Sequence, residues 1–284
     1  MHLRWLAGSF LLFLAAFIKP VGAQDGRADE LRRRHAELAP ALAHSEFGRP
    51  LLLESAQEGD QAQGIVLAVL EAPMARVLAL AEPSRWCDVL MLHPTTRRCQ
   101  VQPSGTGLDV VLAARAGLWS EGVGMQLDFQ RQSPQPDRLD VQLSAERGPL
   151  GTHHYRIRLE AVPLSATQSF MRLSYSYAYG LAARLALQTY LHTRGRDKVG
   201  FSRVPGPAGQ APQPVGGLRG VIERNTMRYF LGIEVLLQTL DLPPAQEDLR
   251  LKAWFDATER YARQLHELDR EEYLQLKRTQ LGLP

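Results

Sequence analysis

The sequence predicts an α+β protein in which a curved antiparallel sheet of about six to eight strands is covered by C-terminal helices, with an additional N-terminal helix. Two patterns carry this prediction. Apolar and polar residues alternate over residues 51–179, and apolar residues recur at helical spacing after Gly180. Short polar turns, such as residues 133–137, join the alternating segments, which favours an antiparallel meander with one buried and one solvated face.

Residues 1–23 have the composition of a secretory signal peptide. Arg4 gives a basic start, residues 5–18 are almost wholly apolar, and residues 21–23 suit a signal peptidase. The apolar run is shorter than the roughly 20 residues that cross a bilayer. We therefore expect cleavage after Ala23 and a periplasmic or secreted protein.

The charge balance of the exported part argues against nucleic-acid binding. The precursor has 33 basic and 30 acidic residues, and removal of the signal peptide takes away Arg4 and Lys19 only. The remaining chain is nearly neutral, without the positive excess of a nucleic-acid binder. The full sequence is 45% hydrophobic, which supports one substantial core, and we place this core in a single domain at residues 51–284.

A charged helix is predicted within residues 24–48, before this domain. Leu31, Leu38 and Leu42 fall on one side of it, and Gly48 and Pro50 end it. Ile65, Leu67 and Val69 then begin the alternating pattern. After Pro73, short helices are expected to lead to Trp86.

Cys87 and Cys99 are the two cysteines of the chain, and export favours a disulfide between them. The turn-like residues 93–96 lie between them, so we expect a hairpin that brings the two thiols together. A redox role is disfavoured because the spacing is much wider than CxxC.

Six further segments alternate, and the helical cover follows them. The alternating segments are residues 99–101, 108–114, 123–129, 139–145, 155–161 and 171–179. The cover is predicted at residues 180–284, with helical stripes in residues 181–191, 218–236 and 254–276. Residues 204–217, rich in Pro and Gly, are expected to form a mobile loop or lid.

The order of these elements resembles the START-like or helix-grip superfamily, and residues 64–86 resemble its opening: a strand, Pro73, a short amphipathic helix and Trp86. The resemblance implies a hydrophobic ligand held between the sheet and a long C-terminal helix. The N-terminal helix, the cysteine pair and two additional helices before the last one depart from that family's pattern.

Motifs of catalysis are absent from the sequence, which contains no GxSxG, P-loop, HExxH or CxxC. His153 and His154 are adjacent, and strand neighbours point to opposite faces, which disfavours a shared metal ion. His153 has the inward parity of Tyr155 and is expected to be a hydrogen-bonded interior residue. We predict no metal and no cofactor.

Tyr155, Tyr175 and Tyr177 are predicted to lie on the buried face of the sheet. Aromatic rings with a polar tip suit a ligand cavity, where the ring packs and the hydroxyl orients a head group. A tyrosine-rich core under the helices is the alternative that the sequence leaves open.

Residues 180–228 concentrate positive charge. Eight basic residues face only Asp197 and Glu223 there: Arg184, Arg194, Arg196, Lys198, Arg203, Arg219, Arg224 and Arg228. Arg194, Arg196, Lys198 and Arg224 in particular suit an anionic membrane surface or an acidic partner. Solvated helix faces explain the same pattern.

Within this segment, residues 219–228 combine charged and apolar side chains. Asn225 falls on the apolar stripe and needs a hydrogen-bond partner. Glu223 is placed to pair with Arg219 one turn back and to lie on the same side as Glu234. The group either lines a pocket mouth under the 204–217 loop or forms a buried network between helices.

Three hypotheses follow. The first is an exported, non-enzymatic protein that binds a hydrophobic or amphipathic small molecule such as a lipid. Its ligand would contact Tyr155, Tyr175, Tyr177, Arg219, Glu223, Asn225 and Arg228. The second is a cell-envelope interaction or scaffold protein that docks through the basic segment. The third is an enzyme, hydrolase-like or cyclase-like, that uses Glu223 or His153 as an acid or base.

Overall fold

The computed structural model describes residues 22–113, 122–132, 135–180, 184, 198–206, 211–243 and 246–283. The signal peptide predicted at residues 1–23 lies almost wholly outside this range, as do Arg194 and Arg196. Among the described helices, none is both long enough and apolar enough to cross a membrane.

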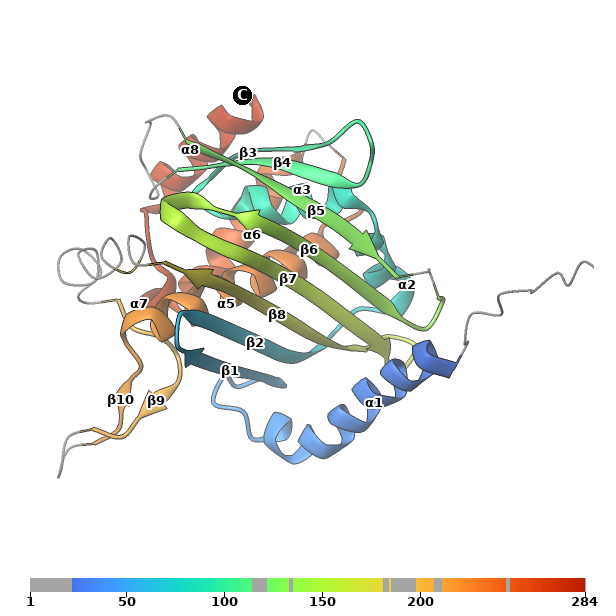
Figure 1. Cartoon of the computed structure of the whole chain (residues 1–284). Coiled ribbons are helices and arrows are strands. Elements are labelled where there is room, and N and C mark those ends of the chain that lie inside the picture. Colours follow the sequence, from blue (N-terminus) through green and yellow to red (C-terminus); the bar gives the residue numbers. More distant parts are fainter. Residues whose placement is uncertain are drawn as a thin grey trace, which may run out of the picture.

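One eight-stranded antiparallel sheet forms the centre of the molecule, in the order β1-β2-β8-β7-β6-β5-β4-β3 (Figure 1). Its strands are β1 (Leu51–Glu58), β2 (Gln61–Leu70), β3 (Thr96–Val101), β4 (Gly107–Leu112), β5 (Val123–Arg131), β6 (Leu139–Arg147), β7 (Thr152–Pro163) and β8 (Ser169–Tyr179). Strands β3 to β8 follow one another as a meander, and β2 pairs with β8. The predicted fold class is confirmed.

Helices cover both faces of the sheet in part. They are α1 (Gly22–Ala43), α2 (Met74–Val77), α3 (Pro83–Leu92), α5 (Gly217–Gln238), α6 (Glu247–Glu259), α7 (Ala262–Leu265) and α8 (Arg270–Leu281), with short 3₁₀ turns η1 (Leu78–Ala81) and η2 (Pro149–Gly151). Figure 1 shows α3, α5 and α6 behind the sheet and α1 in front of it. A two-stranded ribbon of β9 (Arg203–Val204) and β10 (Gln213–Pro214) takes up the ends of the segment predicted to be a loop or lid.

The predicted long C-terminal helix differs from the observed cover. The 22-residue helix α5 packs on β1, β2 and β8, whereas the stripe from Trp254 to Leu276 is divided among α6, α7 and α8. Short connections at residues 260–261 and 266–269 separate these three helices, so apolar spacing persists while the helix direction changes.

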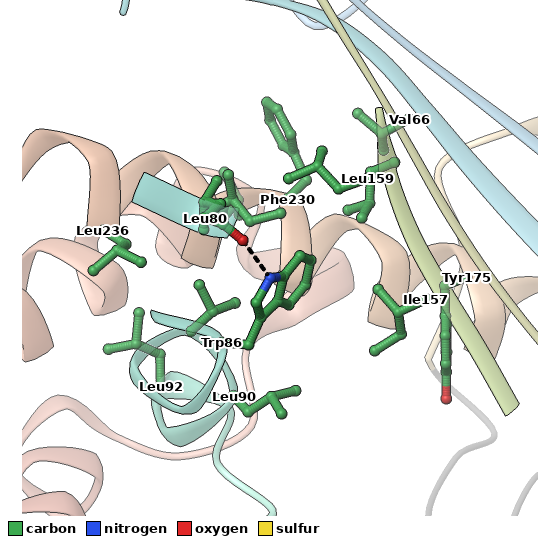
Figure 2. Close-up of a cluster of buried hydrophobic side chains, with 14 of the residues drawn as sticks. Val66, Leu80, Trp86, Leu90, Leu92, Ile157, Leu159, Tyr175, Phe230 and Leu236 are labelled. Atoms are coloured by element: carbon green, nitrogen blue, oxygen red, sulfur yellow. Dashed lines mark hydrogen bonds between the residues drawn. The ribbon is translucent and has the colours of Figure 1, made fainter. Parts of the chain in front are cut away.

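Trp86 of α3 lies at the centre of the core, where it faces α5 and the sheet. It is fully buried, and its indole Nε1 donates to Leu80 O at 2.9 Å. Figure 2 shows Leu90 and Leu92 of α3, Phe230 and Leu236 of α5 and Val66 of β2 around the ring. This apolar cluster fixes α3 between the sheet and the helical layer.

The outer face of the sheet is less solvated than the alternation predicts. Ile65, Leu67 and Val69 point away from the main core and pack with Phe170 and Val162 against α1. Leu31 and Leu42 of α1 are buried there, and Arg32 of α1 pairs with Asp137 at 2.8 Å. Strand β2 is therefore covered on both faces, which explains why its apolar run is nearly continuous.

The predicted disulfide between Cys87 and Cys99 is present, with Cα atoms 5.3 Å apart, but the predicted hairpin is wrong. Cys87 lies on α3 and Cys99 on the edge strand β3. Residues 83–92 form a helix because Pro83 suits its first turn and Trp86, Val89 and Leu90 place an apolar stripe on its buried side. The bond thus ties a helix to the sheet edge.

Helix α5 approaches the sheet most closely where Thr226 meets Gly64 of β2. A Cβ atom at residue 64 would lie 2.3 Å from Thr226 Oγ1 and 3.3 Å from Ile222 O. Both distances are too short for an unshifted side chain, so β2 needs glycine here to let the helix backbone come close.

We predict that Gly64→Ala pushes α5 away from β2 and lowers the free energy of unfolding by about 1–3 kcal/mol, the usual cost of overpacking. Urea denaturation followed by circular dichroism measures this loss. Gly124→Ala is the matched control, since Gly124 also lies on a strand and an alanine methyl group there would meet no neighbouring atom within 4 Å. Equal stability of the two variants would contradict the assigned contact.

Candidate functional site

Four tyrosine rings gather on the concave face of the sheet, beside the crossing point of α5. Tyr155 of β7 stacks on Tyr177 of β8 with ring centres 5.2 Å apart, and Tyr175 contacts both rings. Tyr229 of α5 meets Tyr175 edge-on at 5.2 Å. The three predicted tyrosines are therefore brought together, and the structure adds Tyr229.

The hydroxyl groups of this tyrosine cluster differ in their hydrogen bonding. Tyr155 Oη contacts Thr152 Oγ1 at 2.7 Å. Among the described residues, no partner is found for the hydroxyls of Tyr175, Tyr177 and Tyr229, although burial raises the pKa of all three phenols. Figure 2 shows the Tyr175 hydroxyl directed away from the apolar cluster around Trp86. Within the described part of the chain, three hydroxyls that can both donate and accept thus have no protein partner, and none of them is among the fully covered unpartnered atoms.

His93 joins the tyrosine cluster from the turn after α3. Its ring lies 5.8 Å from that of Tyr229. His93 Nδ1 accepts from the Thr95 backbone N–H at 3.2 Å and lies 2.7 Å from Thr95 Oγ1, so the ring proton belongs on Nε2. The sequence pattern indicates this residue only as part of a turn, because its neighbours come from α5 and α8.

The turn that carries His93 is held from three sides. Tyr273 of α8 donates to Leu92 O at 3.0 Å, and the buried Lys277 of α8 donates to His93 O at 2.7 Å and Thr96 O at 2.8 Å. The disulfide between Cys87 and Cys99 encloses the same turn. Burial lowers the pKa of Lys277 well below its usual value. These contacts give His93 a fixed position.

Asn225 has the partner that its place on the apolar stripe requires. Its side chain hydrogen-bonds His93, and its Oδ1 accepts from Arg228 Nη1 at 3.2 Å. Arg228 Nη2 in turn donates to Glu267 Oε1 at 2.6 Å and to Leu265 O at 3.1 Å. His93, Asn225, Arg228 and Glu267 therefore form one interior polar chain, of which the sequence indicated only Asn225 and Arg228.

Glu223 and Arg219 lie in a separate network one to two turns earlier on α5. The fully buried Glu223 carboxylate accepts from Ser55 Oγ at 2.5 Å and from the backbone N–H groups of Phe201 and Ser202 at 2.6 and 2.9 Å. Arg219 Nη2 donates to the same Ser55 Oγ at 3.0 Å. The predicted pair of Glu223 and Arg219 is thus mediated by Ser55, and the network fastens residues 201–202 and β1 to the helix.

Glu234 does not join that network, although helical spacing predicted the same side for both acids. Its carboxylate pairs with Arg49, which precedes β1, at 3.0 Å. The guanidinium of Arg49 also lies 5.4 Å from the centre of the Phe230 ring. Glu234 therefore holds the connection between α1 and the sheet.

Three of the eight residues predicted to form a basic surface, Lys198, Arg224 and Arg228, are paired or covered by protein, whereas Arg184 and Arg203 are exposed. Arg224 and Arg228 are only 3% and 4% exposed, and Arg228 is paired with Glu267. Lys198 donates to His266 O and lies 3.9 Å from Glu267. Arg224 and Arg228 are interior because they lie on the buried side of α5, where Arg224 Nη1 donates to Val199 O at 3.3 Å. Arg194 and Arg196 fall outside the described residues.

The prediction of an interior His153 is wrong. A bulge between His153 and Arg156 reverses the alternation of β7, with His154 at φ 52°, so His153 pairs with the outward-facing Ala178. Its Nδ1 contacts only Gly151 O, at 3.4 Å, among the described residues. Within the same described residues, no cluster of three or more His, Cys, Asp or Glu side chains is placed to hold a metal ion.

His93, Tyr229, Tyr155 and Asn225 share one further property. His93 and Tyr229 are enclosed by protein deeply enough to lower the pKa of the first well below 6.5 and raise that of the second, yet all four residues keep accessible surface. Side chains in a filled core at this depth are fully covered, as Phe230 and Leu231 are on the same helix. The concave face beside α5 is therefore the candidate site.

Solved structures that are similar to part of this chain include the following three. A START superfamily protein from Mycobacterium smegmatis is 10% identical with a TM-score of 0.39, covering 63% of this chain and 98% of its own. A norcoclaurine synthase from Thalictrum flavum is 16% identical with a TM-score of 0.34, covering 51% and 89%. A protein from Thermus thermophilus is 12% identical with a TM-score of 0.40, covering 63% and 99%.

No family model matches the chain. No curated protein matches its sequence either. These comparisons leave the ligand and any activity of the chain open.

The pKa of His93 gives the stability of the protein a pH dependence. Enclosure lowers this pKa, and the charges of Arg228 and Lys277 act in the same direction. Below about pH 6.5, this histidine binds a proton in the unfolded chain but stays neutral in the folded chain. As the pH decreases further, the free energy of unfolding therefore decreases by up to about 1.4 kcal/mol per pH unit.

We predict that His93→Gln flattens the decline in the free energy of unfolding between pH 7.5 and 5.5, measured by urea denaturation at each pH. The comparison uses the slope against pH, because the substitution also changes stability at neutral pH. His153→Gln is the comparison variant, since it makes the same substitution at the end of β7, outside the contacts that enclose His93. A wild-type slope in His93→Gln would show that His93 is not held neutral.

Proposed function

We propose that this protein is an exported, non-enzymatic carrier that binds a hydrophobic or amphipathic small molecule, such as a lipid, on the concave face of its sheet. The ligand would lie against Tyr155, Tyr175, Tyr177 and Tyr229, with its polar end toward His93, Asn225 and Arg228. Glu223 and Arg219 support this site by fastening residues 201–202 and β1 to α5.

One observation carries the proposal: residues deep in the fold keep accessible surface, and three tyrosine hydroxyls there lack protein partners among the described residues. None of the three hydroxyls is among the fully covered polar atoms without a partner, so each reaches accessible space in which water or a ligand can pair with it. Aromatic walls with a few convergent polar groups are typical of small-molecule sites.

Export is supported by the sequence and by the disulfide. Residues 1–23 have the pattern of a signal peptide, and an oxidising compartment favours the bond between Cys87 and Cys99. The second hypothesis, docking through the basic segment, has no support from Arg224 and Arg228, whose guanidinium groups are buried.

The test begins with the full-length chain expressed in a bacterium and recovered from the periplasm. We expect an intact mass that starts at Gln24 and an apolar molecule in an organic extract of the purified protein. After delipidation, the uncharged fluorophore 1-aminoanthracene should bind with a stoichiometry of one and be displaced by the extracted molecule.

The variant Tyr229→Trp should weaken 1-aminoanthracene binding about tenfold or more, because a larger ring occupies the same space. Tyr261→Trp is its control, since Tyr261 packs with Phe47 and Phe201 on a different aromatic cluster. Absence of both an extracted molecule and probe binding would overturn the proposal.

A further inference from the structure

The accessible surface of the candidate site decreases to zero over a few residues of β7. Tyr155 keeps accessible surface, Ile157 is 4% exposed, and Leu159 is fully covered. The neighbouring strand β8 shows the same decrease, from Tyr175 at 5% to Leu173 at 0%. Because alternate residues of a strand point to one face, both rows of side chains lead from the site into the core.

The core behind Ile157 is filled with apolar side chains. Ile157 pairs in register with Tyr175 on one side and with the fully buried Leu143 of β6 on the other. Figure 2 shows its side chain between Tyr175 and the apolar cluster around Trp86, where Trp86 and Phe230 are completely covered. Since a core of this kind is close-packed, Ile157 lies at the inner limit of the accessible space.

The accessible positions extend over a short distance along both the strand and the helix. Tyr155 and Ile157 are two residues apart on β7, which is about 7 Å, and Asn225 and Tyr229 are four residues apart on α5, which is about 6 Å. At the inner limit, the aliphatic side chain of Ile157 lies beside the Tyr175 ring, whose hydroxyl points away from the apolar cluster (Figure 2). A group that reaches this limit therefore meets an apolar wall.

We propose that Ile157 determines how far a ligand reaches into the protein, and that the part of the ligand in contact with it is a compact apolar group. This inference rests on the proposed binding function and adds a residue that selects ligands by size. A longer group would need space that packed core side chains occupy, and overpacking a core is unfavourable. A shorter group would bury less apolar surface and bind more weakly.

A series of straight-chain alcohols from 1-butanol to 1-decanol measures the depth of the site. Each alcohol displaces 1-aminoanthracene from the delipidated protein, and the fluorescence of the probe reports the displacement. We expect the affinity to rise about threefold to fourfold with each added methylene until the chain reaches Ile157, and to stay constant for longer chains. The chain length at which the rise stops is compared among variants.

Ile157→Ala shortens the side chain at the inner limit and opens space toward Trp86. The rise should then continue for about two more carbons, which strengthens binding of the longest alcohols about tenfold. Ile157→Val removes a single carbon and should shift the limit in the same direction by less, so it carries the test where the alanine variant does not fold.

Leu159→Ala is the matched control. It opens space on the same face of β7, two residues deeper, and leaves Ile157 in place. The variant should unfold at a lower urea concentration than the wild type because it contains a cavity, while the limiting chain length stays that of the wild type.

A wild-type limit in both Ile157 variants, or the same shift in Leu159→Ala, would overturn the role of Ile157 and leave the binding function in place. An affinity that rises without limit through 1-decanol in the wild type would overturn it as well. If neither the alcohols nor 1-aminoanthracene bind to the wild-type protein, the proposed function fails and this inference fails with it.

Discussion

The close contact between Thr226 and Gly64 decides where the helical layer meets the sheet. Glycine on β2 lets α5 lie almost backbone to backbone with that strand. Gly64 pairs in register with Tyr175 on β8, and Tyr175 pairs with Ile157 on β7. The helix therefore rests at one side of the concave face, and the tyrosines stand in the next positions across the sheet.

The interior beside that crossing point has an apolar side and a polar side. Toward α3, the fully buried Trp86 and its leucine neighbours fill the interior with apolar side chains. Toward α8, the interior is polar, because Lys277 and Tyr273 hold the turn that carries His93 against Asn225. The same α5 helix thus contributes Phe230 to an apolar core and Asn225, Arg228 and Tyr229 to a polar one. A buried polar network of this kind is costly unless its members are satisfied, which restricts what can occupy the adjoining space.

Much of the fold follows from local patterns. The period-two alternation predicts each strand of the meander because one face of each is buried, and the charged helix before residue 51 is visible from its leucine spacing. The packing of α1 on β2 cannot be predicted in this way, since Ile65, Leu67 and Val69 show only that one face of the strand is apolar and not which layer covers that face. The alternation misplaces His153 because a single bulge residue at His154 reverses the faces of the strand before it.

The candidate site is only half predictable for a related reason. Tyr155, Tyr175 and Tyr177 share a face by alternation, and Asn225 is conspicuous on an apolar stripe. His93, Glu267 and Lys277 act through contacts between segments distant in the chain, for which no sequence spacing gives a signal.

A crystal structure of the delipidated protein tests the central claim most directly. We expect ordered water within hydrogen-bond distance of the Tyr175, Tyr177 and Tyr229 hydroxyls; rings packed without space, with those hydroxyls bound to protein groups, would contradict it.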